Sequence, residues 1–158
     1  MKFPEIAWSV LQHYEVCDTP LIDVTHSLRV ACSFALEKGE KGQLYVLGFP
    51  HPTGGITYSV EEELLTVRLL SVCPPRAVRP YYQEGYLVGS FPSGISYGWS
   101  HLDVAKRVVA KFSLIPDDFW DNEFPSIPMQ ALYPKPDFMS QICRKIKCKL
   151  AEKGMEYN

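Results

Sequence analysis

The sequence lacks the short motifs that mark the commonest phosphate-binding and metallohydrolase sites. It contains no Gly-x-x-x-x-Gly-Lys-Ser/Thr loop, no Gly-x-Gly-x-x-Gly turn and no His-Glu-x-x-His pair, which excludes the P-loop, the dinucleotide fingerprint and zincin chemistry in their usual form. It also has no apolar run of membrane-spanning length. The first ten residues hold one lysine and an early proline and glutamate, a pattern unlike a signal peptide. We therefore expect a cytoplasmic protein with no membrane partner.

Cysteine is present but lacks a pattern that would pair it. The count is five, which is odd, and no two cysteines form a Cys-x-x-Cys pair. This favours reduced thiols over a disulfide framework. Cysteine and histidine do not share zinc-finger spacing either, so we expect no metal.

Strong net charge is lacking as well. The formal net charge is −2, so the chain as a whole is not built to bind a polyanion. The hydrophobic share of 46% and the charged share of 22% are enough for a packed core and argue against disorder. A length of 158 residues fits one domain, and we assign residues 1–158 to it.

Helical and extended patterns alternate along the chain. Helical spacing of apolar residues predicts helices over 4–14, 27–38, 59–72 and 137–153, with a short turn begun by Pro116. Apolar and β-branched runs predict strands over 42–50, 86–91 and 104–115 and an extended stretch that ends at Asp23, and residues 93–100 are expected to form a loop. One α+β or mixed α/β domain follows, with a small mixed sheet flanked by helices.

Three oxygen-bearing side chains occupy alternate positions before the second predicted helix. These are Asp23, Thr25 and Ser27. They can bond nearby backbone N–H groups, with Ser27 as a helix cap. Alternatively, alternate residues of an extended segment point the same way, and the three oxygens would then form a polar floor for a ribose or an amide.

Two further segments concentrate polar and charged residues. Residues 76–89 bring two arginines, a tyrosine pair, Gln83 and Glu84 to the start of a predicted strand. This segment is either an exposed loop or the edge of a binding site. Residues 144–153 carry five basic residues against one glutamate, which indicates the solvated face of the last helix or a weak site for an acidic partner.

The spacing of these segments resembles the FRG domain family. Gln12-His13-Tyr14, then the stretch TPLIDVT, then LRVACSFA are similar to the central block of that family, which runs Gln-His-aromatic, Thr-x-Leu-Leu-Asp-aromatic-Thr and a helix ending in Phe-Ala. The later block, Arg-x-x-x-Gln-x-Gly-aromatic, is matched by Arg79, Gln83, Gly85 and Tyr86. The resemblance covers residues 12–91 well and residues 104–153 loosely.

Two parts of the family pattern are absent. The turn after Tyr14 has no glycine, and the chain contains no Arg-Gly dipeptide, so the Phe/Tyr-Arg-Gly motif that names the family is missing. The resemblance then implies either a natural short form or a C-terminal piece of the domain. It also implies that NAD affinity suffers, because the upstream arginine is not there.

The FRG domain is itself similar in pattern to NAD-dependent ADP-ribosyltransferases, which implies a nucleotide-using enzyme such as a toxin or defence effector. By that analogy, Gln83 or Glu84 would be catalytic and NAD would be the cofactor. Asp23, Thr25 and Ser27 would orient the ribose, and Arg79 would meet the pyrophosphate. His13 would contact the cofactor, and Tyr81 or Tyr82 would stack on nicotinamide.

Two non-catalytic alternatives remain. The chain can be a nucleotide- or protein-binding module in which the Asp23–Ser27 segment is a structural corner. It can also bind a nucleotide or nucleic acid through Arg76, Arg79 and the basic last helix. The macromolecular target is unknown, and a sheet lacking one strand would expose an edge that a second copy or a partner chain could complete.

Overall fold

The computed structural model describes residues 3–91 and 102–154. The predicted loop over 93–100 lies outside these residues. The helices are α1 (Pro4–His13), α2 (Leu28–Ala35), α3 (Leu69–Val72), α4 (Arg79–Gln83), α5 (Leu102–Ala105), α6 (Pro116–Phe119), α7 (Met129–Leu132) and α8 (Phe138–Glu152). The strands are β1 (Ile22–Thr25), β2 (Gly42–Leu47), β3 (Ile56–Ser59), β4 (Leu64–Arg68), β5 (Gly85–Ser90) and β6 (Val108–Leu114).

The strands form two antiparallel sheets rather than one mixed sheet. One has the order β1-β5-β4-β3, and β2 pairs with β6 in the other. Every described strand pair is antiparallel, so the predicted mixed sheet is wrong, while the predicted α+β class is confirmed. The order leaves β1 and β3 at the edges of the larger sheet, and a partner strand at an edge stays a prediction.

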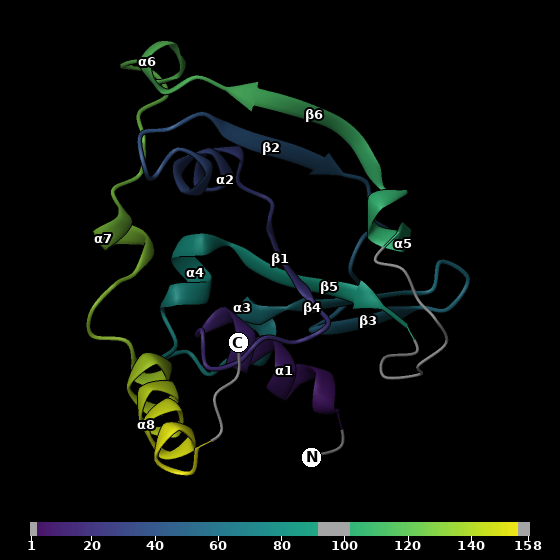
Figure 1. Ribbon diagram of the computed structural model, residues 1–158. Helices are drawn as coiled ribbons and strands as arrows, with labels where there is room; N and C mark the ends of the chain where they lie inside the picture. Colours follow the sequence, from purple (N-terminus) through teal and green to yellow (C-terminus); the bar gives the residue numbers. More distant parts are fainter. Residues whose placement is uncertain (1–2, 92–101, 155–158) are drawn as a thin grey trace.

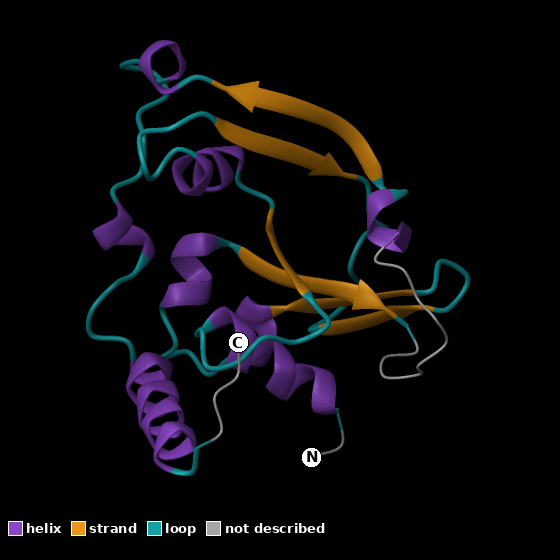
Figure 2. Ribbon diagram, viewed as in Figure 1, coloured by secondary structure: helices purple, strands orange, loops and turns teal. Residues whose placement is uncertain are grey.

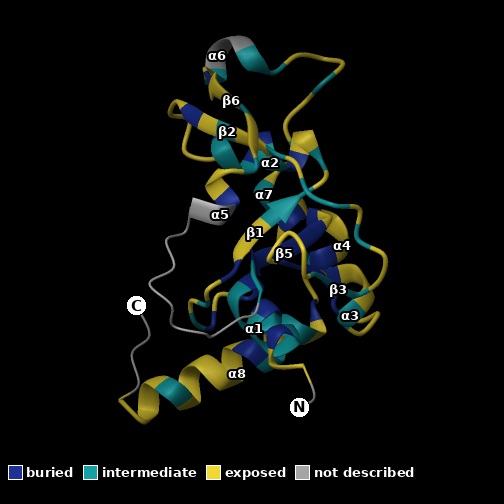
Figure 3. Ribbon diagram, turned by 90° about the vertical axis from the view of Figure 1, so that its right-hand side faces the viewer, coloured by how far each residue is buried: buried dark blue, intermediate teal, exposed yellow. Residues whose placement is uncertain are grey.

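Both faces of the larger sheet are covered (Figures 1 and 2). α1 and α3 lie on one face, and α2 with the β2–β6 pair lies on the other. The largest apolar cluster sits on the α1 side and consists of Leu21, Leu65, Val67, Leu69 and Leu87. Figure 3 shows that buried residues gather around this sheet, whereas α8 and the β2–β6 pair are mostly exposed.

The predicted helix over 59–72 is wrong except at its end, where residues 69–72 form α3. The burial of β4 explains the error. Residues 64–67 are all buried, so the side chains on both faces of this strand are shielded from solvent. A strand buried on both faces reads as a continuous apolar run, which periodicity cannot distinguish from a buried helix. Ser59 ends β3, and Glu63 turns the chain into β4 at a φ of 49°.

Most other predicted elements are confirmed with shifted ends. α1, β2, β5 and α8 lie within a few residues of their expected bounds. α2 begins after Ser27 as expected but ends at Ala35 rather than near residue 38. The expected strand over 104–115 is shortened to β6, because its first residues belong to α5 and the following turn. In the part of the chain that the structure describes, no helix combines the length and apolar character needed to cross a bilayer.

We expect Leu65→Ala to lower the free energy of unfolding by about 2–5 kcal/mol, because it leaves a cavity at a residue with no exposed surface. Urea unfolding followed by circular dichroism measures the change. Val60→Ala is the matched control: Val60 is 70% exposed, so its effect should stay within about 0.5 kcal/mol. Equal losses for the two variants would contradict the assigned core.

Candidate functional site

The first FRG-like block fastens α1 to β1. The Gln12 side-chain amide donates to the Leu21 carbonyl at 2.8 Å and to the Asp23 carboxylate at 3.1 Å. His13 Nδ1 lies 2.9 Å from the other Asp23 oxygen. The His13 side chain is 3% exposed, whereas that of Asp23 is 46% exposed. His13 therefore acts within the scaffold here, and Asp23 has one side open to solvent.

Gly85 makes room for this arrangement. A Cβ at position 85 would lie 3.1 Å from His13 Cε1 and 3.1 Å from Leu69 Cδ1, which is tighter than ordinary van der Waals contact. Gly85 also pairs with Thr25 across the β1–β5 ladder. The glycine of the second FRG-like block thus lets the histidine of the first block pack against the sheet.

Thr25 and Ser27 form a hydrogen-bonded corner between β1 and α2. The Thr25 hydroxyl donates to the Gln83 backbone carbonyl at 2.8 Å and accepts from the Ser27 backbone N–H at 3.1 Å. Ser27 Oγ accepts from the Val30 backbone N–H at 3.5 Å and so caps α2. These contacts match the turn-and-cap alternative of the sequence analysis. They also join the two FRG-like blocks directly.

The second block places its two candidate catalytic residues in opposite environments. Gln83 is 6% exposed, and its side-chain amide donates to the Leu132 carbonyl of α7 at 2.8 Å. Glu84 is exposed and forms the C-cap of α4, where its backbone is in the left-handed conformation with a φ of 47°. Tyr82 is 49% exposed and contacts Tyr81 edge to face. The buried amide is thus committed to the scaffold, and the carboxylate faces water.

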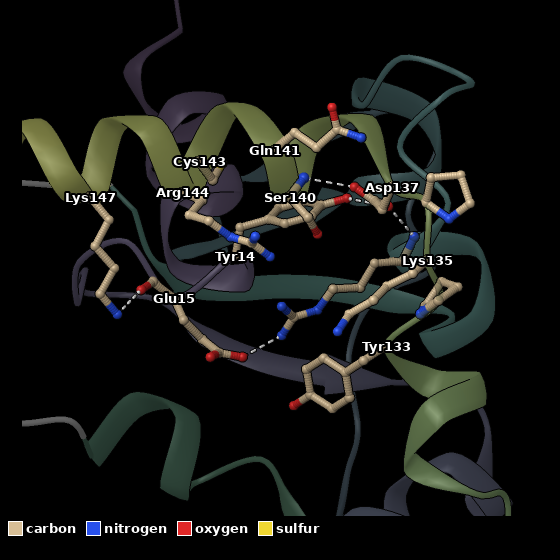
Figure 4. Close-up of a pocket in the computed structure, with 13 residues that line it drawn as sticks. Tyr14, Glu15, Tyr133, Lys135, Asp137, Ser140, Gln141, Cys143, Arg144 and Lys147 are labelled. Atoms are coloured by element: carbon tan, nitrogen blue, oxygen red, sulfur yellow. Dashed lines mark hydrogen bonds and ion pairs between the residues drawn. The ribbon is translucent and has the colours of Figure 1, made fainter.

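A pocket of about 450 Å³ lies beside this region, where the end of α1, the start of α4 and the first turns of α8 meet (Figure 4). We call it the basic pocket. Its lining residues are Tyr14, Glu15, Arg79, Tyr133, Pro134, Lys135, Pro136, Asp137, Ser140, Gln141, Cys143, Arg144 and Lys147. Of the residues assigned to the NAD site by the FRG resemblance, Arg79 belongs to this lining, and Arg144 and Lys147 of the predicted basic last helix also belong to it.

Arg79 is held between aromatic rings at the floor of the basic pocket. Its Cζ lies 4.4 Å from the centroid of the Tyr133 ring and 5.4 Å from that of Tyr14, which is cation–π range. Its Nη2 donates to Glu15 Oε1 at 2.7 Å. Its side chain is 11% exposed, and its buried Nε has no hydrogen-bond partner among the described residues.

Asp137 fixes the walls of the pocket. This residue is 2% exposed and caps α8 by accepting from the Ser140 backbone N–H at 2.7 Å. Its other oxygen accepts from the Val78 and Arg79 backbone N–H groups at 2.7 and 2.8 Å and from the Tyr14 hydroxyl at 3.2 Å. Burial alone would raise the pKa of Asp137, but these hydrogen bonds outweigh burial and lower it below its ordinary value.

The charge around the pocket is predominantly positive. Arg79, Lys135, Arg144 and Lys147 line it against two acidic residues, Glu15 and Asp137. The Asp137 carboxylate is already occupied by four donors. Lys147 Nζ donates to the Glu15 backbone carbonyl at 2.9 Å and leaves the carboxylate of that residue to Arg79 (Figure 4). Such a surface attracts anions.

The thiol and phenol groups in or near the pocket are poor nucleophiles. Burial, with a smaller effect of Asp137, raises the pKa of Cys73 to about 11. Burial and then Asp137 also raise the pKa of Tyr14. Both groups therefore stay protonated near neutral pH, and a protonated thiol does not attack. All five cysteines are free, and the described residues contain no group of three potential metal ligands.

Sequence reasoning missed most of this pocket. Glu15, Tyr133, Lys135 and Asp137 were not singled out. The basic run that contains Arg144 and Lys147 was expected to be a solvated face, a weak site for an acidic partner or, with Arg76 and Arg79, a nucleotide- or nucleic-acid-binding surface. One usable signal was present: Asp137 directly precedes an apolar helix pattern, which is typical of an N-cap. A Gly-x-Ser-x-Gly pentapeptide at 94–98, the pattern of a hydrolase nucleophile elbow, lies outside the described residues.

Comparison with known proteins adds no relative: no family model, no curated protein and no solved structure matches the chain.

We expect Asp137→Asn to destabilise the protein by about 1.5–3 kcal/mol at pH 7. The substitution replaces a charged carboxylate, which accepts four hydrogen bonds, by a neutral amide that accepts them more weakly. The pKa of Asp137 is lower in the folded state than in the unfolded chain. The stabilisation is therefore complete above the unfolded pKa of about 4 and is lost as the pH falls through the folded value. Urea unfolding at pH 7 and pH 3 should show a gap between wild type and variant that narrows at pH 3. A gap independent of pH would contradict the role of the charge.

Proposed function

We propose that the protein is an FRG-type domain that binds a nucleotide without cleaving it. The proposal rests on one contrast among the residues that the FRG resemblance singles out. The side chains of Thr25, Ser27 and Gln83 form hydrogen bonds with backbone groups of the protein itself. Arg79, in contrast, lines a pocket of ligand size. A guanidinium between two tyrosine rings is suited to the phosphates of a nucleotide.

The arrangement of the late residues argues against bond cleavage. Breaking the nicotinamide–ribose bond develops positive charge on the sugar. A carboxylate stabilises that charge only when it is fixed beforehand in a site that excludes water. Glu84 stands exposed at the end of α4, and the Gln83 amide points to Leu132. Glu84 therefore lacks surroundings that exclude water, and the Gln83 side chain is held by the scaffold through its Nε2.

An NAD-consuming enzyme is the second candidate, and the Thr25–Gln83 hydrogen bond favours it. That bond places the end of β1 beside the end of α4, so the half-exposed Asp23 and the exposed Glu84 belong to adjoining segments. The chain would then be an ADP-ribosyltransferase or NAD glycohydrolase, acting as a toxin or defence effector on an unknown macromolecular target. His13 and Tyr82 would contact NAD in that case.

Two measurements distinguish the two candidate functions. Chromatography detects nicotinamide released after incubation with NAD, and a thermal melt detects ligand binding. We expect no release above buffer, and a rise in Tm with ADP-ribose, because the ligand binds only the folded state. The same measurements with Glu84→Gln and Asp23→Asn serve as controls. Nicotinamide release that either substitution abolishes would overturn the non-catalytic proposal in favour of the enzyme.

A further inference from the structure

The Arg79 guanidinium is only half used by its ion pair with Glu15. An arginine presents parallel N–H groups on Nε and Nη2, which suit a ligand with two oxygens. Glu15 supplies one oxygen, to Nη2, at 2.7 Å. The Nε donor is buried and has no partner among the described residues, a condition that costs free energy in a folded protein. The Nε and Nη2 donors of Arg79 together suit a ligand with two acceptor oxygens, and Glu15 satisfies only one of these donors.

Glu15 is also easily displaced. Its side chain is 63% exposed, in contrast to the 11% of its partner Arg79, so water can take over the contacts of the carboxylate when the ion pair opens. Its backbone adopts a left-handed φ of 57°, which is uncommon for a residue with a side chain. Lys147 holds the Glu15 backbone carbonyl and not the carboxylate, so the carboxylate can swing into solvent while the chain around it stays in place.

The remaining wall of the basic pocket suits a group with more negative charge than one carboxylate. Lys135, Arg144 and Lys147 surround the same hollow, and the described contacts of Asp137 occupy both of its oxygens. Once Glu15 leaves, four cations face a single acidic residue that is already satisfied. A phosphate offers two oxygens to the Arg79 fork and further oxygens to these cations.

We infer that the basic pocket is a phosphate-binding site, in which Glu15 stands in for the phosphate and leaves when the ligand binds. The inference rests on the proposed nucleotide-binding function and names the group that is recognised: the phosphate or pyrophosphate of a nucleotide. Arg79 binds it through Nε and Nη2, and Tyr14 and Tyr133 keep the guanidinium in place. The carboxylate of Glu15 acts as a built-in competitor that lowers the affinity for weaker anions.

Isothermal titration at constant ionic strength tests the site with inorganic pyrophosphate, ADP and adenosine. We expect pyrophosphate and ADP to bind and adenosine not to bind. Glu15→Gln should tighten pyrophosphate binding by about two- to fivefold, because it removes the competing charge. Arg79→Lys should weaken binding at least about tenfold, because an ammonium lacks the two-pronged geometry. Arg76→Lys is its matched control, since Arg76 lies over Phe138 and does not line the pocket.

A second pair of variants tests the phosphate site even if Arg79→Lys fails to fold. Arg144→Gln removes an exposed cation of the pocket lining, and Lys145→Gln removes its exposed neighbour outside that lining. Arg144→Gln should weaken pyrophosphate binding, and Lys145→Gln should leave it unchanged. Thermal melts by circular dichroism should give both variants the Tm of the wild type.

The outcomes separate this inference from the proposed function. Binding of ADP and adenosine alike, or nucleotide binding that neither Arg79→Lys nor Arg144→Gln weakens, would overturn the phosphate site and leave nucleotide binding standing. Pyrophosphate binding without a gain in Glu15→Gln would overturn the displacement of Glu15. Absence of binding by pyrophosphate, ADP and ADP-ribose would overturn both proposals.

Discussion

The hydrogen bonds to the buried Asp137 carboxylate are the interactions on which the packing of α1, α4 and α8 around the basic pocket depends. A buried charge is tolerated only when hydrogen bonds satisfy it, and Asp137 obtains them from the end of α1, the start of α4 and the first turn of α8. These segments come from distant parts of the sequence, and a single acceptor brings their ends together. The location of Arg79 follows from this, because its own backbone N–H is one of the donors.

A second polar network performs the same task at the edge of the larger sheet. Gln12 and His13 bind Asp23, and Thr25 binds the carbonyl of Gln83. The two networks are linked through the chain, because Tyr14 follows His13 and Arg79 begins the helix that Gln83 ends. Gln12, His13, Asp23, Thr25 and Gln83 therefore connect into one framework around β1, β5 and α4. That framework explains the spacing of these residues without requiring that each one touch a ligand.

The sequence predicted what local chemistry determines and failed where tertiary burial decides. The Ser27 cap and the amphipathic α8 depend on neighbouring residues, and their prediction is confirmed. The extended stretch before α2 was also predicted, but β1 continues to Thr25 and does not end at Asp23. β4 was mistaken for a helix because its burial on both sides depends on elements far away in the chain. The pocket residues come from separated segments, so no local pattern unites Glu15 with Tyr133 or Arg144. The alternation of Asp23, Thr25 and Ser27 was visible, but the carbonyl that Thr25 binds was not.

The pairing of β2 with β6 joins residues from the first third of the chain to residues from its last third. Closing such a long loop costs chain entropy before any contact repays it. Few core contacts offset this entropy loss, because most residues of β6 remain exposed. Leu114 is the β6 residue that joins the apolar cluster with Cys32 and Leu36. We therefore expect this ribbon to open more readily than the four-stranded sheet. Its amide protons should exchange with solvent sooner than those of the four-stranded sheet.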